Sequence, residues 1–384
     1  MTRTVVLAGA SGYGRTHLAE IAELEAAGLV RLAGVCDVRP LDPQALALVG
    51  GRPFDTDLGR LLDSTRPDIG IVATPIHTHL PLARQVLAAG AHLLVEKPPL
   101  PTADDWRELL RLARAAGLVC QTGFQSLGSH AVARLARLMA DGRLGRIRGI
   151  GGYGAWSRTD SYYTRADWAG RRELHGAPVV DGALTNPFAH MIATALRLDG
   201  STGWDDVGDI EVELLHARDI AADDTSCMRL RTAKGTVVTT AVTLCAETPS
   251  DPVLLVIGTY GHARLHYTSD VLHIDGMREQ HGRVSPLRNL LAHLDDPAAA
   301  LQSPLEACGA FMKVLEAVRT APDPCPVPAR WIRRTGEGGD GRLRVIGVDA
   351  AVRAAAEHLS TFAELDVPFR PHLPSATPSH GDRP

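Results

Sequence analysis

The first 125 residues alternate short apolar runs with longer amphipathic stretches. This alternation is typical of parallel strands joined by crossover helices, so it predicts a doubly wound α/β domain over residues 1–124. The predicted strands are residues 4–9, 30–37, 68–74, 92–96 and 118–123. Hydrophobic residues make up 45% of the chain and charged residues 22%, which is ordinary usage for a globular protein with a large core.

After about residue 145 the pattern changes to longer stretches with period-two alternation, which is typical of antiparallel strands. It predicts an α+β domain over residues 125–365. The strands are expected at residues 147–156, 209–217, 225–232, 236–245, 253–259 and 262–268, and helices at residues 186–198, 305–320 and 349–363. Proline and glycine predict irregular chain at residues 321–341, and residues 366–384 are expected to form a proline-rich tail with little to bury.

Composition excludes several classes of partner. The formal net charge of -4 and the pI of about 6.5 provide no clustered basic charge for nucleic acid or for an anionic membrane. The six cysteines form no C-x-x-C pair, so neither a zinc site nor a disulfide framework is expected. The chain starts without a recognisable leader and has no long apolar run, so we expect a cytoplasmic location. From the spacing of the cysteines, no bound metal is expected either.

A glycine loop directly follows the first predicted strand. The stretch GASGYGRTH places Gly9 and Gly14 at the outer positions of the G-x-G-x-x-G pattern, with Ser11 in the middle and Gly12 and Tyr13 beside it. A tight turn that enters a helix presents backbone N–H groups to a pyrophosphate, so these five residues are predicted to hold a dinucleotide. The alternative is a purely structural turn between strand and helix.

An acidic residue ends the next predicted strand. Asp37 follows Gly14 by 23 residues, where a carboxylate would accept hydrogen bonds from the adenosine ribose hydroxyls. This favours NAD over NADP, although Arg39 could hold a 2′-phosphate, so NADP stays possible. Asp37 could also merely cap the following loop.

Lys97 stands where ligands of an open parallel sheet collect, at the carboxyl end of the apolar run 93–95. The chain has only three lysines, and the smaller ammonium of lysine differs from arginine in having a tunable pKa. In a cleft beside a nicotinamide, Lys97 could stabilise an alkoxide or relay a proton. The alternative is a lysine that pairs with Glu96 at a domain boundary.

Four motifs together resemble those of the Gfo/Idh/MocA oxidoreductases, which include glucose–fructose oxidoreductase and inositol dehydrogenases. They are GASGYGRTH (9–17), ATPIHTHLPLA (73–83), VEKPP (95–99) and GRLGRIRGI (142–150), and the resemblance spans roughly residues 3–365. It implies a Rossmann domain, bound NAD(P) and a second domain with a large open sheet often used for oligomerisation. It further implies that Lys97 lies near the reacting carbon and that the Lys97–Pro98 bond is cis.

The resemblance also implies further contacts with the cofactor. These are carried over to Thr74, Pro75, His77, His79, Glu96 and Pro98. His77 and His79 are two residues apart, which is a poor match to helical zinc-ligand spacing, so no metal is expected there.

Family members commonly carry an aspartate four residues before a histidine at the start of a helix in the second domain. Here His190 matches the histidine and Asn186 replaces the aspartate. We expect Asn186 to be the N-cap of that helix and His190 to be a neutral base one turn later. Asn186 could hydrogen-bond a substrate hydroxyl or serve as a cap alone, Asp181 could supply the missing carboxylate, and His190 could be a core histidine.

Aromatic residues are only 4% of the chain, yet five fall within residues 153–168. Tyr153, Trp156, Tyr162, Tyr163 and Trp168 are interspersed with Arg158, Asp160, Arg165 and Asp167. Flat apolar faces with hydrogen-bonding groups suit a polyhydroxylated ring, so a sugar or cyclitol is expected as substrate, with Gln125 and Asp181 also among its contacts. Such a set could instead fill the core of a sheet or a dimer contact.

These observations predict an NAD(P)-dependent enzyme that transfers hydride between nicotinamide and a secondary alcohol of a sugar, amino sugar or cyclitol. Within the range of the family, an NAD-dependent glycoside hydrolase is an alternative, as is a non-catalytic dinucleotide sensor. Asn186 in place of the family aspartate favours the sensor, whereas Lys97 and His190 argue against it. A homodimer or homotetramer through the second sheet is expected as the assembly.

Overall fold

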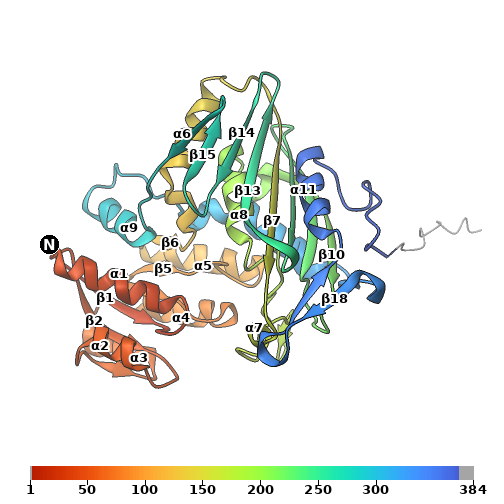
Figure 1. Cartoon of the computed structure of the whole chain (residues 1–384). Coiled ribbons are helices and arrows are strands. Elements are labelled where there is room, and N and C mark those ends of the chain that lie inside the picture. The colour runs from red at the N-terminus through yellow and green to blue at the C-terminus, as the bar shows by residue number, and fades with distance from the viewer. Residues whose placement is uncertain (1, 372–384) are drawn as a thin grey trace, which may run out of the picture.

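The computed structural model describes residues 2–371 and places two large sheets in two domains (Figure 1). The first sheet has six strands in the order β3-β2-β1-β4-β5-β6, and the second has nine. Every pairing in the first sheet is parallel, so the predicted doubly wound sheet is confirmed.

The first domain contains all five predicted strands and one more. Its strands are β1 Arg3–Ala8, β2 Val30–Cys36, β3 Phe54–Asp55, β4 Ile69–Val72, β5 His92–Val95 and β6 Cys120–Thr122. Its helices are α1 Gly14–Ala26, α2 Pro43–Val49, α3 Leu58–Thr65, η1 Ile76–Thr78, α4 His79–Ala88 and α5 Ala103–Ala116. The additional strand, β3, has two residues, which is too short to produce a period in the sequence.

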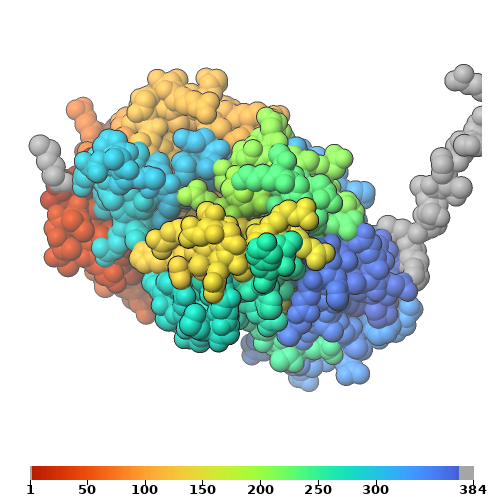
Figure 2. Space-filling view, turned by 90° about the horizontal axis from the view of Figure 1, so that it is seen from above, coloured from red at the N-terminus to blue at the C-terminus, as the bar shows by residue number. Residues whose placement is uncertain are grey.

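Helices cover both faces of this sheet. Apolar side chains of α3, α4 and α5 pack on one face, and those of α1 and α2 pack on the other. The second face is completed by α9 (Pro286–Asp295), which lies far along the chain in the range that the sequence assigns to the second domain. Arg3 donates to the carbonyl of Leu294 at 2.8 Å, and Figure 2 shows this cyan segment against the red N-terminal residues.

The second sheet is mixed and mainly antiparallel. Its strands, in order across the sheet, are β16 Met277–Gln280, β15 Val271–Ile274, β14 His262–His266, β13 Cys245–Gly258, β7 Ile147–Ser157, β12 Val237–Thr243, β11 Thr225–Thr232, β10 Val207–His216 and β17 Cys325–Pro326. The central strand β7 pairs antiparallel with β13 and parallel with β12.

Helices also lie on both faces of the second sheet (Figure 1). On the face toward the first domain are η2 Gln125–Gly128, α6 His130–Ala140, α8 Ala189–Asp199, η4 Leu305–Cys308 and α10 Gly309–Thr320. On the opposite face, α11 (Val348–His358) packs on β7, β12 and β13. The remaining short elements are α7 Asp160–Tyr163, β8 Glu173–Leu174, β9 Ala177–Pro178, η3 Trp204–Asp206, η5 Ala329–Trp331, β18 Ile332–Thr335, η6 Gly338–Asp340 and β19 Arg342–Val345.

Two predictions for the proline-rich segments are wrong in part, one about regular structure and one about burial. Residues 321–341 contain β17 and also β18, which pairs with β19 in a hairpin, because their apolar residues pack against the outer face although proline and glycine surround them. The expected tail begins with Val367 and Phe369, which are 7% and 0% exposed and belong to the same core. The rest of that predicted tail, residues 372–384, lies outside the described residues.

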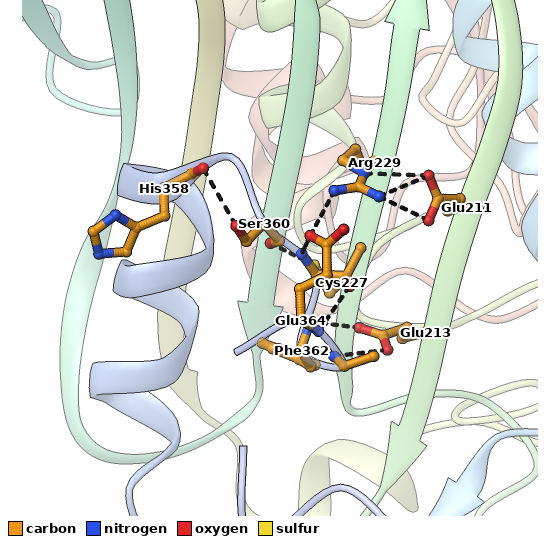
Figure 3. A network of polar contacts seen from close by, with 10 residues as sticks. Glu211, Glu213, Cys227, Arg229, His358, Ser360, Phe362 and Glu364 are labelled. Carbon is orange, nitrogen blue, oxygen red and sulfur yellow. Dashed lines mark hydrogen bonds and ion pairs between the residues drawn. The ribbon is translucent and has the colours of Figure 1, made fainter. Parts of the chain in front are cut away.

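Polar contacts hold the segment that follows α11 against β10 and β11 of the second sheet (Figure 3). Arg229 of β11 contacts Glu211 of β10 and Glu364, with nitrogen–oxygen distances of 3.0 and 2.6 Å. The carboxylate of Glu213 accepts hydrogen bonds from the backbone N–H groups of Phe362 and Ala363. The segment therefore packs as part of the domain.

No helix within residues 2–371 has the length and apolar character needed to cross a membrane.

Candidate active site

The glycine loop between β1 and α1 has the shape of a phosphate cradle. Gly9 has a φ of +88°, and a Cβ atom there would lie 2.4 Å from the carbonyl oxygen of Ala73, so no side chain fits. A Cβ at Gly14 would lie 2.0 Å from the carbonyl oxygen of Gly9, so this glycine lets the helix start close to the strand.

The outer side of this loop is open. A Cβ at Gly12 would meet nothing within 4 Å, and Ser11, Gly12 and Tyr13 are wholly or partly exposed. Within residues 2–371, the N–H groups of these three residues donate to no backbone or side-chain acceptor. The serine at the middle position of the pattern therefore leaves the amides available to a pyrophosphate.

Asp37 lies beside this loop. Its Oδ2 accepts the N–H of Ala10 at 2.9 Å, and its Oδ1 accepts the N–H of Arg39 at 3.0 Å. Each carboxylate oxygen retains a lone pair for a ribose hydroxyl. The side chain of Arg39 is exposed at the same edge.

The loop after β4 carries the threonine, proline and histidines expected around the cofactor. Thr78 donates to the hydroxyl of Thr74 at 2.7 Å, and Pro75 precedes η1. His77 is half-buried, its Nδ1 has no hydrogen-bond partner among residues 2–371, and burial lowers the pKa of its imidazole.

His79 has a different position from the one expected. Its ring is buried, with Nδ1 2.9 Å from the carbonyl oxygen of Pro99 and Nε2 2.8 Å from that of Thr74. Both ring nitrogens are therefore used within the protein. His79 joins the loop after β4 to the loop after β5 and offers no ring nitrogen to a cofactor, which corrects the expected contact.

Glu96 is also turned inward. Its Oε1 lies 2.8 Å from Nε2 of His17, and its Oε2 accepts the backbone N–H of Lys97 at 3.1 Å. It fixes the backbone beneath the lysine, and the lysine's own ammonium points elsewhere. The Lys97–Pro98 peptide bond is cis, as expected.

The ammonium of Lys97 crosses to the second domain. Nζ donates to the backbone carbonyl and to Oδ1 of Asn186, both at 3.0 Å. Since an ammonium only donates, the amide oxygen of Asn186 must face it, and the amide nitrogen then donates to Oδ1 of Asp181. Lys97, Asn186 and Asp181 thus form one continuous polar chain.

Burial and the neighbouring charges shift the pKa values of Lys97 and Asp181, the two ionisable members of this hydrogen-bonded chain. Burial lowers the pKa of Lys97; Glu96 and Asp181 oppose this effect, and Arg165 adds to it. Burial raises the pKa of Asp181, whose Oδ2 accepts the N–H of Gly170 at 2.8 Å and lies 3.4 Å from the guanidinium of Arg165. Both shifts bring the groups toward neutral pH, where proton-transfer groups are useful.

His190 lies in the first turn of α8, which packs on the face of the second sheet that is turned toward the first domain. Burial first, and then the charges of Lys97 and Arg283, hold the pKa of His190 well below its ordinary value, so the imidazole is neutral. Its Nδ1 is 3.4 Å from the hydroxyl of Ser126, which in turn accepts a hydrogen bond from Thr194 at 2.9 Å. The ring can therefore accept a proton.

The expected cap at Asn186 is wrong. Helix α8 begins at Ala189 after Phe188, and residues 183–188 form turns, so Asn186 precedes the helix. Its side chain contacts Lys97 and Asp181 instead of the helix N-terminus. The neutral state of His190 follows mainly from burial, and the helix end is not its main cause.

The aromatic residues of 153–168 divide between the two faces of the sheet. Trp156 stacks on Phe188 with ring centroids 4.5 Å apart, next to Asn186. Tyr153 is buried in the core under α11 on the opposite face, which contradicts its expected contact with the substrate. Tyr163 is covered by Arg218, and its buried hydroxyl has no partner among the residues that the structure describes.

Arginines alternate with the remaining rings. The guanidinium of Arg165 lies 3.6 Å from the ring centroid of Tyr162 and 4.5 Å from that of Trp168. Asp160 binds Arg218 and Arg334, so it has a structural role, and Asp167 is exposed. Gln125, at the start of η2, has a buried amide oxygen with no partner in the described part of the chain, a group that a ligand could satisfy.

Sequence reasoning missed the residues that orient the imidazole. Ser126 and Thr194 have no motif of their own, although Thr194 lies four residues after His190 and therefore on the same helix face. No three His, Cys, Asp or Glu side chains in the part of the chain that the structure describes are grouped as metal ligands.

Comparisons with known proteins agree with this architecture. Residues 3–124 match the model of the "oxidoreductase family, NAD-binding Rossmann fold", and residues 132–264 match the GFO/IDH/MocA C-terminal domain. D-glucoside 3-dehydrogenase of Escherichia coli K12 is 32% identical over 119 residues, covering 31% of this chain and 34% of that protein. A dTDP-3,4-didehydro-2,6-dideoxy-α-D-glucose 3-reductase of Streptomyces antibioticus is 36% identical over 90 residues, covering 23% of this chain and 27% of the reductase.

Two solved structures share the fold across both domains. The WlbA dehydrogenase of Bordetella pertussis, in complex with NADH and UDP-GlcNAcA, has a TM-score of 0.68 and 22% identity, covering 83% of this chain and 95% of that one. GenD2 from gentamicin A biosynthesis, in complex with NAD, has a TM-score of 0.66 and 21% identity, covering 83% and 93%.

Proposed function

The chain belongs to the Gfo/Idh/MocA family of oxidoreductases, and from that premise we propose that it is an NAD-dependent dehydrogenase or reductase of a sugar-like secondary alcohol. The observation that carries the proposal is the Lys97 ammonium, held 3.0 Å from Asn186 next to the neutral His190. Lys97 of the first domain supplies a stabilising cation and His190 of the second domain a neutral base. Both lie beyond the carboxyl ends of the first sheet, where ligands of such sheets bind.

The residues present fit a bound NAD. The N–H groups of Ser11, Gly12 and Tyr13 would hold the pyrophosphate, and Asp37 would accept the adenosine ribose hydroxyls. His77 and the orphaned amide oxygen of Gln125 lie in loops that follow β4 and β6, toward the nicotinamide end. When bound, NAD supplies a hydride acceptor at C4 of its nicotinamide.

Two side chains of this chain act on the substrate. His190 accepts the hydroxyl proton as the C–H hydride departs, and Lys97 stabilises the negative charge that develops on the oxygen. In the reductive direction, the same imidazole, once protonated, returns the proton to the alkoxide. Ser126 orients the ring through its contact with Nδ1.

In this proposal, Asp181 provides the negative charge near Lys97 that family members carry on an aspartate at the position of Asn186. Its carboxylate is one side chain farther from Lys97 and acts through the amide of Asn186. It favours the charged form of the lysine and aligns the amide that holds it. Asp181 and Asn186 are therefore positioning residues in this proposal.

The experiment is to incubate the protein with NAD or NADP and a panel of aldoses, amino sugars and cyclitols while absorbance at 340 nm is followed. A substrate-dependent rise in NADH supports the proposal. Glycoside cleavage without accumulation of NADH would identify the hydrolase alternative. Tight NAD binding without turnover of any compound would identify a sensor.

We also propose that the protein forms a homo-oligomer through its second sheet. The support is the part of the outer face formed by β14 and β15, where the side chains of His262, Arg264 and His266 are exposed or half-exposed, beyond the area that α11 covers. Light scattering after size-exclusion chromatography gives the subunit number. A monomeric mass at micromolar concentration would contradict this assembly.

A further inference from the structure

Arg158, which follows β7, has a guanidinium that is stacked on rings but is not paired. Its backbone is fixed, because its N–H donates to the carbonyl of Leu244 and its own carbonyl accepts from Arg218, both at 2.9 Å. The guanidinium carbon lies 4.9 Å from the ring centroid of Trp156 and 5.0 Å from that of Tyr162. Within residues 2–371, no acceptor binds this guanidinium, and its buried Nε has no partner.

The other arginines around this segment each contact a carboxylate. Asp160 binds both Arg218 and Arg334, so it has no remaining charge for Arg158. Arg165 contacts Asp181, at 3.4 Å. The part-buried Arg158 thus lacks the acceptor that buried guanidinium groups normally have, and an anion would satisfy it.

The position of Arg158 connects it to the proposed reaction site. Tyr162 contacts both Arg158 and Arg165, with its ring centroid 5.0 and 3.6 Å from the two guanidinium carbons. The indole of Trp156, under Arg158, stacks on Phe188, which is two residues from Asn186 and two from His190. A wall of aromatic rings therefore leads from Arg158 to the turn that carries the lysine-bound amide.

This wall carries an excess of positive charge. Three cations lie along it: Arg165 contacts Asp181, Lys97 has Glu96 and Asp181 as neighbouring carboxylates, and Arg158 has no carboxylate partner within residues 2–371. We infer that Arg158 binds a carboxylate or phosphate group on the substrate, so that the substrate is an anionic sugar derivative. The inference rests on the proposed oxidoreductase function and deepens it by naming the class of substrate.

The test compares sugars that differ only in the anionic group. NADH formation is followed with D-glucose, D-glucuronate and D-glucose 6-phosphate, and with the corresponding galactose set. We expect kcat/KM to be about 10- to 100-fold higher for one anionic member of a set than for its neutral member, which is the range for a charge-assisted hydrogen bond. The uronate and phosphate arms identify which anion is recognised.

Arg158→Gln should lower kcat/KM for the anionic member about tenfold or more beyond any change for the neutral member, and Arg158→Lys should restore part of the preference. Arg111→Gln, at an exposed arginine on α5, is the matched control. Preference for the neutral member, or an equal effect of Arg158→Gln on both members, would overturn the inference while the proposed function stands.

Absence of turnover with every sugar would count against the proposed function alone. In that case titration calorimetry of D-glucuronate and D-glucose 6-phosphate against the NADH-loaded protein still decides the inference. Binding of one anion that weakens about tenfold or more in Arg158→Gln supports it, since such a loss matches one charge-assisted contact. Equal affinity in the two proteins, or no binding in either, contradicts it.

Discussion

The Lys97 ammonium donates to Asn186 twice, once to the backbone carbonyl and once to the side-chain oxygen, each at 3.0 Å. This pair of contacts joins the first sheet to the turn before α8 across the boundary between the domains. It fixes the direction of the ammonium and orients the amide toward Asp181. Lys97 is thus positioned by the neutral side chain of Asn186, which in turn donates a hydrogen bond to the carboxylate of Asp181.

Lys97→Ala should lower kcat by about 10²-fold or more, because the developing alkoxide loses its cation. The affinity for NADH should change little, since the proposed phosphate and ribose contacts lie at Gly9–Gly14 and Asp37. Arg111→Ala removes an exposed cation on α5 and is the matched control. Stopped-flow turnover with fluorescence titration of NADH separates the two effects, and unchanged kcat in Lys97→Ala would contradict the mechanism.

Exchanging the amide and the carboxylate tests their partnership. Asn186→Asp alone places two carboxylates in contact, so one must be protonated, and kcat should fall by about tenfold or more. Adding Asp181→Asn restores one amide and one carboxylate, now in reverse order, and kcat should recover most of that loss. A double-mutant cycle on kcat measures the coupling. Strictly additive effects would show that the two residues act independently.

The alkaline limb of the pH profile should report Lys97. The pKa of this ammonium is lowered by burial, so the active charged form is lost as pH rises through a value below 10.5. Asp181 raises that pKa and Arg165 lowers it, so Asp181→Asn should move the limb to lower pH and Arg165→Met should move it to higher pH. Profiles of kcat/KM for the three proteins check the two opposite directions. Shifts of the same sign would contradict this assignment.

Several features of the site followed from local sequence patterns. The period of the apolar runs gave the parallel sheet, and Lys97 could be placed at its ligand-binding edge because it directly follows such a run. Gly9 and Gly14 were identified from the G-x-G-x-x-G spacing, and in the structure their positions leave no room for a side chain. These predictions needed only residues close together in the chain.

Other features depend on contacts between distant residues or on details of the backbone. Asp181 meets Asn186 through a turn that has no sequence signature, and α9 covers a sheet whose nearest strand in sequence ends at Thr122. The misplacement of Tyr153 was avoidable, however. In a strand, residues an odd number apart point to opposite faces, so Tyr153 and Trp156 of β7 could not both face the substrate.

Phe369 should be a stabilising core residue, although it lies in a proline-rich stretch. Its ring is fully buried and packs edge-to-face against Phe362, with centroids 5.8 Å apart, on the outer face of the second sheet. Phe369→Ala should therefore lower the free energy of unfolding by about 3 kcal/mol or more. Phe54→Ala, at a ring that is 42% exposed, should cost much less. Urea unfolding followed by tryptophan fluorescence measures the free energy of unfolding of the two variants. A loss in Phe369→Ala as small as the one expected for Phe54→Ala would mean that the segment after α11 does not contribute to the core.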